Sequence, residues 1–564
     1  MADKITQSPI PNPQSPIPNL RSPISSLPPK IQAVIQSRLA HLTPSARELA
    51  QLAAVVGRAF SLDELATFSG QAEMAVGQAL EELWERRIIR QQGSHSYDFS
   101  HDRIRDVALG EINPVRRGLL HRQIAAGLQQ RYGDELDPVV DALAWHCEQA
   151  GLIEQAVTFY KRAAILAESR FVYAQAGQHS RHALDLLATL PPSRVTRSTE
   201  LELLLVLAEA LRKIVGFASP ELMVVYHRAS VLWSEVGTLA QLYQIKQGLW
   251  GYHLNRSELQ QARIYATEEL EIVEELGYPS ALPWGWADLA WALLALGDFT
   301  GVLKQINHAL PPDETDPAQE VNIAWSAAQG QAAQALWLLG YPAQAQARFH
   351  LAEHFVPFYP GSMGQVVVLD VLAQTSNFWG DGVWLAAHAE EMERLTVENG
   401  LPLYFGISQV HKGFALARQG HAEAGIAHLV QGLAHIQRAG TTFNRPYYQT
   451  LLAEAYGLAG QAAEAMRALD EGIALAESSG EVWWLAEQYR LRGELLAASG
   501  QAAEAAEWMQ RGLEFARSLN ARSLELRAAH SLARLSQRRG PRSSGGSLSV
   551  LLRRLRFDTG FPTG

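Results

Sequence analysis

The sequence is poor in cysteine and in long hydrophobic runs, and each shortage excludes a class of protein. A single cysteine, Cys147, occurs among 564 residues. No internal disulfide framework can therefore form, and the chain fits a reducing compartment. No apolar run of about 18 residues occurs, so no membrane-spanning helix is expected. The first residues also lack the apolar core of a signal peptide. We therefore expect a cytoplasmic protein without a membrane partner.

Charge and the common catalytic motifs are also scarce. Charged residues make up 19% of the chain and the net charge is −10. Such a balance gives no general attraction for nucleic acid or anionic membranes. The phosphate-binding motif G-x-x-x-x-G-K-[ST] is absent, and neither G-x-S-x-G nor a dinucleotide fingerprint appears where it would have to lie. We expect a protein that is not an enzyme and that binds no cofactor or metal of its own.

What the sequence does contain is a repeat. Glycines recur at steps of 43 and then 40 residues: Gly297, Gly340, Gly380, Gly420, Gly460 and Gly500. A period in this range is typical of a helical solenoid, which presents extended surfaces to partners more often than it performs chemistry. We expect each glycine to form the tight turn between two helices, where a positive φ costs least.

Small residues keep a fixed register with these glycines. One occurs seven residues before each glycine, and another, such as Ala465 or Ala505, follows most of them at five residues. A third small residue usually comes twelve residues after the glycine. Small side chains at three positions per unit allow antiparallel helices to approach closely. The pattern predicts a mainly α fold of stacked helical hairpins, with an ordinary helical bundle as the alternative.

This register resembles that of tetratricopeptide repeats, in a form longer than the usual unit. The clearest copies read LAEAYGLAGQAAEAMRALDEGIALAESSG and LRGELLAASGQAAEAAEWMQRGLEFARSLN. The resemblance implies a right-handed superhelical solenoid. We assign a first repeat region to residues 131–190, irregular helical repeats to 191–286 and regular repeats of about 40 residues to 287–535.

Both ends of the chain differ from the repeats. Residues 1–27 contain three proline-bearing heptads, which favour a disordered or polyproline-like lead. This lead is either an inert linker or a ligand for a proline-reading domain. Residues 536–564 are rich in arginine, glycine and serine. They predict a basic flexible tail, with a nucleic-acid arm as the alternative.

Residues 28–130 read as a separate domain with an entry helix. Thr43 and Pro44 are typical of a helix N-cap and first helical position. Helices are expected at about 45–56, 61–68 and 72–87, followed by a hairpin over 88–101 and a long helix from about Asp102. Three helices and a hairpin predict a winged-helix-like fold. Its third helix is rich in glutamate, so insertion into a DNA groove would be electrostatically unfavourable.

A more specific resemblance lies in this domain. The strings LTPSARELAQLAAVVGRAFSLDEL and YDFSHDRIRDVAL precede the repeats. Together they resemble the centre of signal-transduction ATPases with numerous domains, such as maltose-regulator-type activators and ATPase-linked cyclases. In that family a nucleotide-binding module, a winged helix and a helical sensor array follow one another. The present sequence lacks the phosphate loop, a cyclase domain and a C-terminal DNA-binding motif, so we expect a split, truncated or partnered relative.

The resemblance also suggests a nucleotide-sensing group. In the wider family, a winged-helix histidine can contact the diphosphate of a nucleotide held by the preceding module. His101 occupies the corresponding place, with Arg103 and Arg105 beside it. ATP or ADP would then be met only through a missing or separate module. The alternative is that His101 caps the following helix or packs on the hairpin.

Three other groups look catalytic but fit the repeat pattern better. His350 and His354 belong to an H-x-x-E-H string inside the repeat register, without a third ligand. His146 and Cys147 are neighbours in a helix and so do not face each other. His179 and His182 are one helical turn apart, but we expect them to lack a carboxylate or cysteine companion. We predict no catalytic and no metal site.

The sequence contains fourteen tryptophans, and most of those in the repeats are expected at seams between helices. Some could line a concave groove and anchor a peptide or a small ligand. The preferred interpretation is a regulatory or sensor protein that couples ligand binding in the repeats to a winged-helix clamp on a nucleotide switch. An adaptor without a switch is the alternative, and a DNA-binding transcriptional regulator is the third hypothesis.

Overall fold

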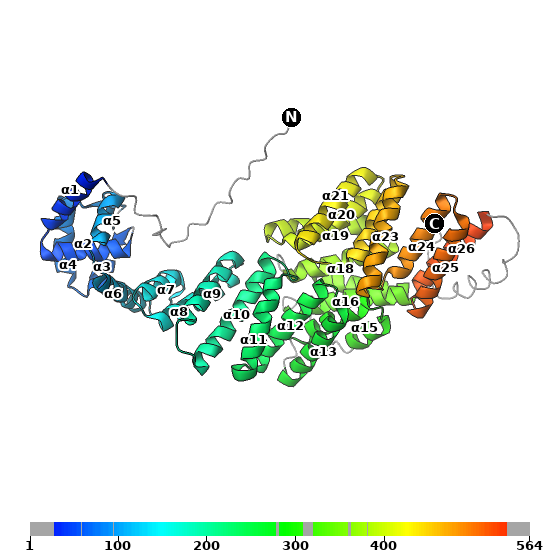
Figure 1. Cartoon of the computed structure of the whole chain (residues 1–564), viewed down its shortest axis with the longest axis horizontal. Helices are drawn as coiled ribbons and strands as arrows, with labels where there is room; N and C mark the ends of the chain where they lie inside the picture. Colours follow the sequence, from blue (N-terminus) through cyan, green and yellow to red (C-terminus); the bar gives the residue numbers. More distant parts are fainter. Residues whose placement is uncertain are drawn as a thin grey trace, which may run out of the picture. The chain divides into compact units, whose positions relative to one another are not determined.

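The computed structural model describes residues 28–57, 59–93, 95–277, 281–307, 320–358, 363–380 and 382–538. The predictions for the lead and for nearly all of the tail lie outside these residues. Within them the chain is mainly α-helical and divides into two compact units, Met1–Leu207 and Ala208–Gly564 (Figure 1). We call them the N-terminal and the C-terminal unit, and each has its own hydrophobic core.

The N-terminal unit begins with helices and a small sheet. Their order is α1 (Pro29–Ala40), α2 (Pro44–Val56), β1 (Phe60–Ser61), α3 (Leu62–Ser69), α4 (Glu73–Glu85), β2 (Ile89–Gln92) and β3 (Ser96–Phe99). The antiparallel sheet has the order β1-β3-β2, with Phe60 opposite Tyr97 and Ile89 opposite Phe99. The Thr43 hydroxyl accepts a hydrogen bond from the amide of Ala46, and Pro44 is the first helical residue. The predicted cap of α2 is therefore confirmed.

The long helix expected from Asp102 is wrong. Instead, α5 (Asp102–Gly110) ends after nine residues and α6 (Pro114–Tyr132) follows it. The break has a local cause: the side chain of Asn113 caps α6 by accepting from the amide of Arg116, and Pro114 opens that helix. A proline cannot donate the hydrogen bond that a continuous helix would need at this point.

Helix pairs fill the rest of the N-terminal unit. They are η1 (Asp137–Val139), α7 (Val140–Gln149), α8 (Ile153–Ser169), α9 (Tyr173–Leu187) and the start of α10 (Arg194–Ile214), which contains the boundary between the units. Gly151 turns the chain between α7 and α8 with φ +73°. This turn lies within residues 131–190, the region that the sequence analysis assigns to the first repeat.

The C-terminal unit is a series of antiparallel helix pairs. It opens with α11 (Pro220–Val236), α12 (Leu239–Asn255) and α13 (Leu259–Leu276). The regular pairs are α14 (Leu282–Ala295) with α15 (Phe299–Ile306), α16 (Glu320–Leu339) with α17 (Pro342–Phe355), α18 (Met363–Trp379) with α19 (Gly382–Glu398), α20 (Pro402–Arg418) with α21 (Ala422–Arg438), α22 (Arg445–Leu458) with α23 (Ala462–Ser479), and α24 (Leu485–Ala498) with α25 (Ala502–Ser518). The turn η2 (Val356–Phe358) follows α17, and α26 (Arg522–Arg538) ends the described chain.

Each predicted glycine turns the chain inside one of these pairs. All six have positive φ, from +72° at Gly380 to +93° at Gly420. The small residues Ala465 in α23 and Ala505 in α25 are fully buried. An α-solenoid of helical hairpins is thus the fold of this unit. A second set of left-handed turns, which the repeat pattern did not predict, lies between the pairs at Gly400, Gly440 and Gly480.

The inner helices of the pairs are buried along most of their length. All residues from Ala287 to Ala295 in α14 and from Ile323 to Leu338 in α16 are buried. In an open solenoid one face of such helices would contact solvent. Here later repeats cover that face, so the open concave groove expected from the sequence is closed along α14 and α16.

Hydrogen bonds to backbone carbonyls mark where later repeats return to earlier ones. The amide of Thr442 donates to the carbonyl of Asn255 over 2.8 Å, and the amide of Val482 donates to the carbonyl of Ala295 over 2.9 Å. The hydroxyl of Ser523 donates to the carbonyl of Trp337. The partners are 187, 187 and 186 residues apart along the chain. This constant spacing shows that the pairs wind back on themselves after between four and five repeats.

Candidate ligand-binding site

The predicted nucleotide-sensing residues lie at the start of α5. His101 occupies the N-cap position, but its side chain makes no capping hydrogen bond, and the side chains of His101 and Arg103 are exposed. Arg105 is different, because its side chain is buried and forms an ion pair with Asp106 at 3.0 Å. The structure thus leaves two of the three residues available to a partner.

His146 and Cys147 do not form a thiol–imidazole pair. The Nδ1 atom of His146 lies 2.9 Å from Nδ1 of His121, and both rings are buried. The Sγ atom of Cys147 lies 3.8 Å from Oε1 of Gln155 instead. Burial raises the pKa of the Cys147 thiol to about 11, so the thiolate needed by a nucleophile is not formed near neutral pH.

We expect Cys147 to resist alkylation in the folded protein. Iodoacetamide reacts with the thiolate form of cysteine. Burial limits access of the reagent to Cys147, and the raised pKa keeps its thiol protonated. The measurement is the rate of carbamidomethylation, followed by mass spectrometry, in buffer and in denaturant. Similar rates in the two conditions would contradict the buried environment described here.

The buried pair of His121 and His146 should make the N-terminal unit sensitive to acid. Burial lowers the pKa of His121 to about 4 and that of His146 to about 3, with nearby Arg117 and His121, respectively, adding to the effect. In the unfolded chain each imidazole titrates near pH 6.5, so the unfolded state binds more protons between pH 6.5 and about 4. Stability is therefore fully present above pH 6.5 and decreases as the pH falls. At pH 5 the loss is about 2 kcal/mol per histidine.

Hydrogen exchange of amides in α6 and α7 at pH 7.5 and pH 5, corrected for intrinsic rates, measures this loss. A double variant with His121→Gln and His146→Gln should show a smaller change between the two pH values. An equal change in the variant would contradict the assignment of the acid sensitivity to this pair.

Two other histidines have carboxylate companions that the sequence analysis missed. His179 Nε2 lies 3.1 Å from an oxygen of Asp141, and His182 Nε2 lies 2.9 Å from Glu148. The hydroxyl of Tyr160 also donates to Glu148 over 2.8 Å. The carboxylates belong to α7 and the histidines to α9, so the pairing depends on how these helices stack. The prediction that the histidines lack such partners is wrong.

The H-x-x-E-H string does not assemble a metal site. His350 Nδ1 lies 3.5 Å from Glu353, whose other oxygen lies 3.7 Å from His388 on α19. Among the residues that the structure describes, no group of three or more histidine, cysteine, aspartate or glutamate side chains is placed to hold a metal ion.

Several repeat aromatics pack against one another rather than line an open groove. The indoles of Trp337, Trp483 and Trp484 are buried with Phe378 and Tyr447, and the centroids of Phe378 and Trp484 are 5.1 Å apart in a stacked arrangement. This cluster joins α16, α18 and α22 to the segment before α24. Its rings are core residues, as expected for most of the tryptophans at seams.

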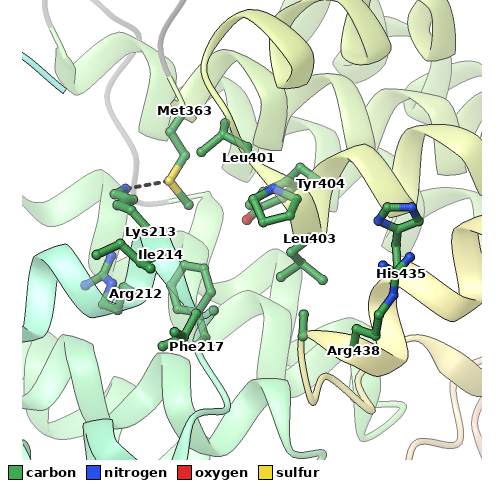
Figure 2. Close-up of a pocket in the computed structure, with 14 residues that line it drawn as sticks. Arg212, Lys213, Ile214, Phe217, Met363, Leu401, Leu403, Tyr404, His435 and Arg438 are labelled. Carbon is green, nitrogen blue, oxygen red and sulfur yellow. Dashed lines mark hydrogen bonds between the residues drawn. The ribbon is translucent and has the colours of Figure 1, made fainter. Parts of the chain in front are cut away.

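A pocket of about 260 Å³ remains where the first and the later repeats of the C-terminal unit meet (Figure 2). Four chain segments contribute its lining: the end of α10 and the following turn, the start of α18, the start of α20 and the end of α21. The lining residues are Arg212, Lys213, Ile214, Val215, Gly216, Phe217, Met363, Leu401, Pro402, Leu403, Tyr404, His435, Arg438 and Ala439. A molecule held here would contact helices that are far apart in the sequence.

The positive charges of the pocket are held mainly by α10. Arg212 and Lys213 share the carboxylate of Glu209, each at 3.3 Å. Burial alone would lower the pKa of Arg212, but Glu209, Tyr226 and Asp288 together outweigh it and raise the pKa, so the guanidinium stays charged. Burial, together with the nearby Arg438, lowers the pKa of His435. None of the lining residues is acidic.

Close backbone contacts fix one wall of the pocket. A Cβ atom at Gly216 would lie 3.3 Å from the carbonyl oxygen of Ala439, and φ at Gly216 is +89°. A larger residue would hold α21 away from the turn after α10. No motif in the sequence indicated this site, because its residues come from segments that align only when the repeats wind back. The one local signal for the site is a pair of cations, Arg212 and Lys213, followed directly by the mostly apolar stretch Ile214–Phe217.

The chain is distantly similar to one curated protein. No family model matches it. An uncharacterized protein of Rhizobium meliloti (strain 1021) is 26% identical over 451 residues, which cover 78% of this chain and 44% of the relative. The chain therefore spans less than half the length of that protein.

Solved structures similar to the chain include three helical-repeat proteins. One is a signal-transduction ATPase with numerous domains and a tetratricopeptide repeat sensor from Pyrococcus horikoshii, with 10% identity, a TM-score of 0.35, and coverage of 93% of this chain and 65% of that one. A Rap protein complexed with Competence and Sporulation Factor has 12% identity, a TM-score of 0.37, and coverage of 71% and 99%. The Cut9 and Hcn1 assembly of APC/C has 14% identity, a TM-score of 0.33, and coverage of 84% and 92%. The α-solenoid fold itself is established by the helix pairs described above.

Within the described residues, no helix combines the length and the apolarity needed to cross a bilayer.

Proposed function

We propose that this chain is a non-enzymatic regulatory protein whose helical repeats bind a ligand and bias the state of a nucleotide-binding partner. The observation that carries the proposal is the pocket at the meeting point of α10, α18, α20 and α21. Because these helices are distant in the sequence, a ligand between them links the first repeat segment to the later ones. Binding then stabilises the arrangement in which the repeats wind back on themselves, relative to any more open arrangement.

The N-terminal unit would be the output side of this switch. In it, α2, α3 and α4 precede a hairpin, and β1 pairs with β3, the second strand of the hairpin, an order that supports a winged-helix-like clamp. His101 and Arg103 are exposed at the start of α5 and provide donors for a phosphate group. The nucleotide would belong to an ATPase module that this sequence does not contain. The protein itself would need no cofactor and would act in the cytoplasm.

The test is co-purification from native cells with wild-type chain, His101→Ala and the matched control His95→Ala. Both histidines are exposed, and His95 lies on the hairpin six residues earlier. Loss of a nucleotide-binding partner in His101→Ala alone supports the switch. Unchanged partners in both variants would refute it and favour the alternative, a tetratricopeptide-like adaptor that holds proteins together without switching.

A DNA-binding regulator is less well supported. The helix that would enter the major groove is α4, and its side chains Glu73, Glu81 and Glu85 are exposed. The carboxylate of Glu82 is instead engaged within the domain. It accepts a hydrogen bond from the hydroxyl of Thr43, the N-cap residue of α2, over 2.5 Å. Three exposed carboxylates on this helix would face phosphates, which is unfavourable.

A further inference from the structure

We propose that the pocket between α10, α18, α20 and α21 binds a small organic anion: a carboxylate or phosphate head attached to an apolar body. This inference rests on the proposed function and names the ligand class of its site. The shape gives the first argument. A volume of about 260 Å³ lies near the lower end of the range for small-molecule pockets, so it suits a metabolite rather than a folded partner.

The charge balance favours an anion. Arg212, Lys213 and Arg438 line the pocket, whereas the nearest carboxylate, Glu209, lies behind the first two and is shared between them. The side chain of Arg438 donates a hydrogen bond to a backbone carbonyl, that of Ala434, over 3.2 Å. Asp288 also acts on Arg212, but burial raises the pKa of the Asp288 carboxyl well above its usual value, which favours the neutral form. The lining of the pocket thus carries cations and no carboxylate.

One donor of Arg212 lacks an acceptor in the described part of the chain, and the ammonium of Lys213 contacts a poor acceptor in addition to its ion pair with Glu209. The ammonium of Lys213 lies 2.6 Å from the thioether sulfur of Met363, drawn as a dashed line in Figure 2, although a thioether is a poor acceptor. The Nε atom of Arg212 is buried and has no hydrogen-bond partner among the described residues. An oxyanion would satisfy such donors far better than sulfur does.

The first turn of α20 adds an independent positive contribution. Leu401, Leu403 and Tyr404 line the pocket, and Leu401 is the N-cap residue of this 17-residue helix. Its side chain makes no capping hydrogen bond, and Pro402 follows as the first helical residue. The N-terminus of a helix carries a partial positive charge, which an anionic head would complement.

The rest of the lining is apolar and selects the body of the ligand. Ile214, Val215 and Phe217 line one side, and Met363, Leu401 and Leu403 line the other, as Figure 2 shows for the labelled side chains. The guanidinium of Arg212 also lies over the ring of Phe217 at 5.0 Å, which fixes the cation beside the apolar wall. An inorganic anion would leave this wall in contact with water, so an amphipathic anion fits better.

Calorimetric titration of the full chain tests the inference with octanoate and octyl phosphate below their micelle-forming concentrations. Octanol, which lacks the charge, and inorganic phosphate, which lacks the apolar body, serve as the matched neutral and head-only probes. We expect saturable binding of one or both amphipathic anions and at least tenfold weaker binding of octanol and of phosphate. The comparison of the two anions identifies which head the site prefers.

Variants assign the binding to this pocket. Lys213→Met removes the charge at similar length and should weaken binding about tenfold, and Arg438→Gln should weaken it by a smaller factor without disturbing the exposed end of α21. Lys246→Met is the control, because Lys246 does not line the pocket. Its ammonium lies 2.6 Å from the carboxylate of Glu268. Circular dichroism will check that each variant is folded. If Lys213→Met does not fold, Arg438→Gln still tests the site.

Equal affinity for octanoate and octanol, or unchanged affinity in both pocket variants, would overturn the inference. So would the absence of binding by any amphipathic anion. Co-purification with His101→Ala does not depend on this measurement. A negative titration with a positive co-purification therefore removes only the ligand class, and the opposite result leaves the anion site without the nucleotide switch.

Discussion

Replacing Gly413 by alanine should destabilise the C-terminal unit by about 2 kcal/mol or more, although it adds a single methyl group. A Cβ atom at Gly413 would lie 2.5 Å from the carbonyl oxygen of Gly425 and 2.8 Å from the amide nitrogen of Leu429. Both obstacles are backbone atoms of α21, so no rotamer change can relieve the clash. The helices α20 and α21 would have to separate. Urea unfolding followed by circular dichroism should show a lower midpoint.

Gly457→Ala is the matched control for Gly413→Ala. Gly457 also lies inside a helix, α22, but it is exposed and no atom lies within 4 Å of the position of its missing Cβ. Alanine there should raise the stability by about 0.5–1 kcal/mol, because glycine is the poorer helix former. A loss of stability in Gly457→Ala similar to that in Gly413→Ala would contradict the packing argument.

The same contact shows why the repeat could be read from the sequence. Gly413 and Gly425 exclude each other's side chains, since a Cβ at Gly425 would lie 2.4 Å from the carbonyl oxygen of Gly413. A requirement of this kind leaves a small residue at a fixed place in every unit. A left-handed turn likewise leaves a glycine, as at Gly420 and Gly460. Local constraints on residue size and φ are therefore visible in one sequence.

The winding of the repeats could not be read in the same way. It depends on backbone hydrogen bonds such as the one from Thr442 to Asn255, and every residue except proline has the same backbone donor and acceptor. No residue type marks such a contact. The closed inner face and the pocket that it forms with the end of α10 were consequently outside the reach of the sequence analysis. The carboxylate partners of His179 and His182 were missed for the same reason, because they lie on a different helix.

The break between α5 and α6 is a different kind of failure. Asn113 and Pro114 are a helix start signal of the same type as Thr43 and Pro44, which the sequence analysis recognised. The information was present and a continuous helix was still inferred.

In contrast, whether His101 and Arg103 sense a nucleotide remains a prediction, because their exposure allows the contact without requiring it.

Glu487→Gln should destabilise the C-terminal unit by about 3 kcal/mol, the largest loss that we expect from a change of so few atoms. The Glu487 carboxylate is 2% exposed and accepts from Arg490 at 2.8 Å and from Arg527 at 3.0 Å. Burial alone would raise the pKa of this carboxyl, but the two guanidinium groups outweigh it and lower the pKa to about 2. Glutamine removes the counter-charge that Arg490 and Arg527 share; the largely buried Arg490 then keeps only the longer contact to Glu494 at 3.4 Å among its ion pairs with described residues, and Arg527 is 32% exposed.

The loss should spread to the contact between early and late repeats. Arg527 belongs to α26, donates to the carbonyl of Phe378 over 3.0 Å and lies 5.0 Å above the ring of Trp337. Without Glu487, the position of this arginine against α16 and α18 is no longer fixed. Hydrogen exchange should therefore increase in α26 as well as in α24, while urea unfolding reports the total loss.

Glu464→Gln provides the control, because Glu464 forms an exposed pair with Arg467 at 2.8 Å. Such a surface pair contributes between about 0 and 1 kcal/mol. The pH dependence gives a second check on Glu487. Since its folded pKa lies below the unfolded value of 4.5, its stabilisation is complete above pH 4.5 and is lost as the pH falls toward 2. In Glu487→Gln that part of the acid sensitivity should vanish, whereas Glu464→Gln should retain it. A variant Glu487→Gln as stable as wild type at neutral pH would mean that the arginines find other acceptors, and that the late repeats are not held to the early ones through this carboxylate.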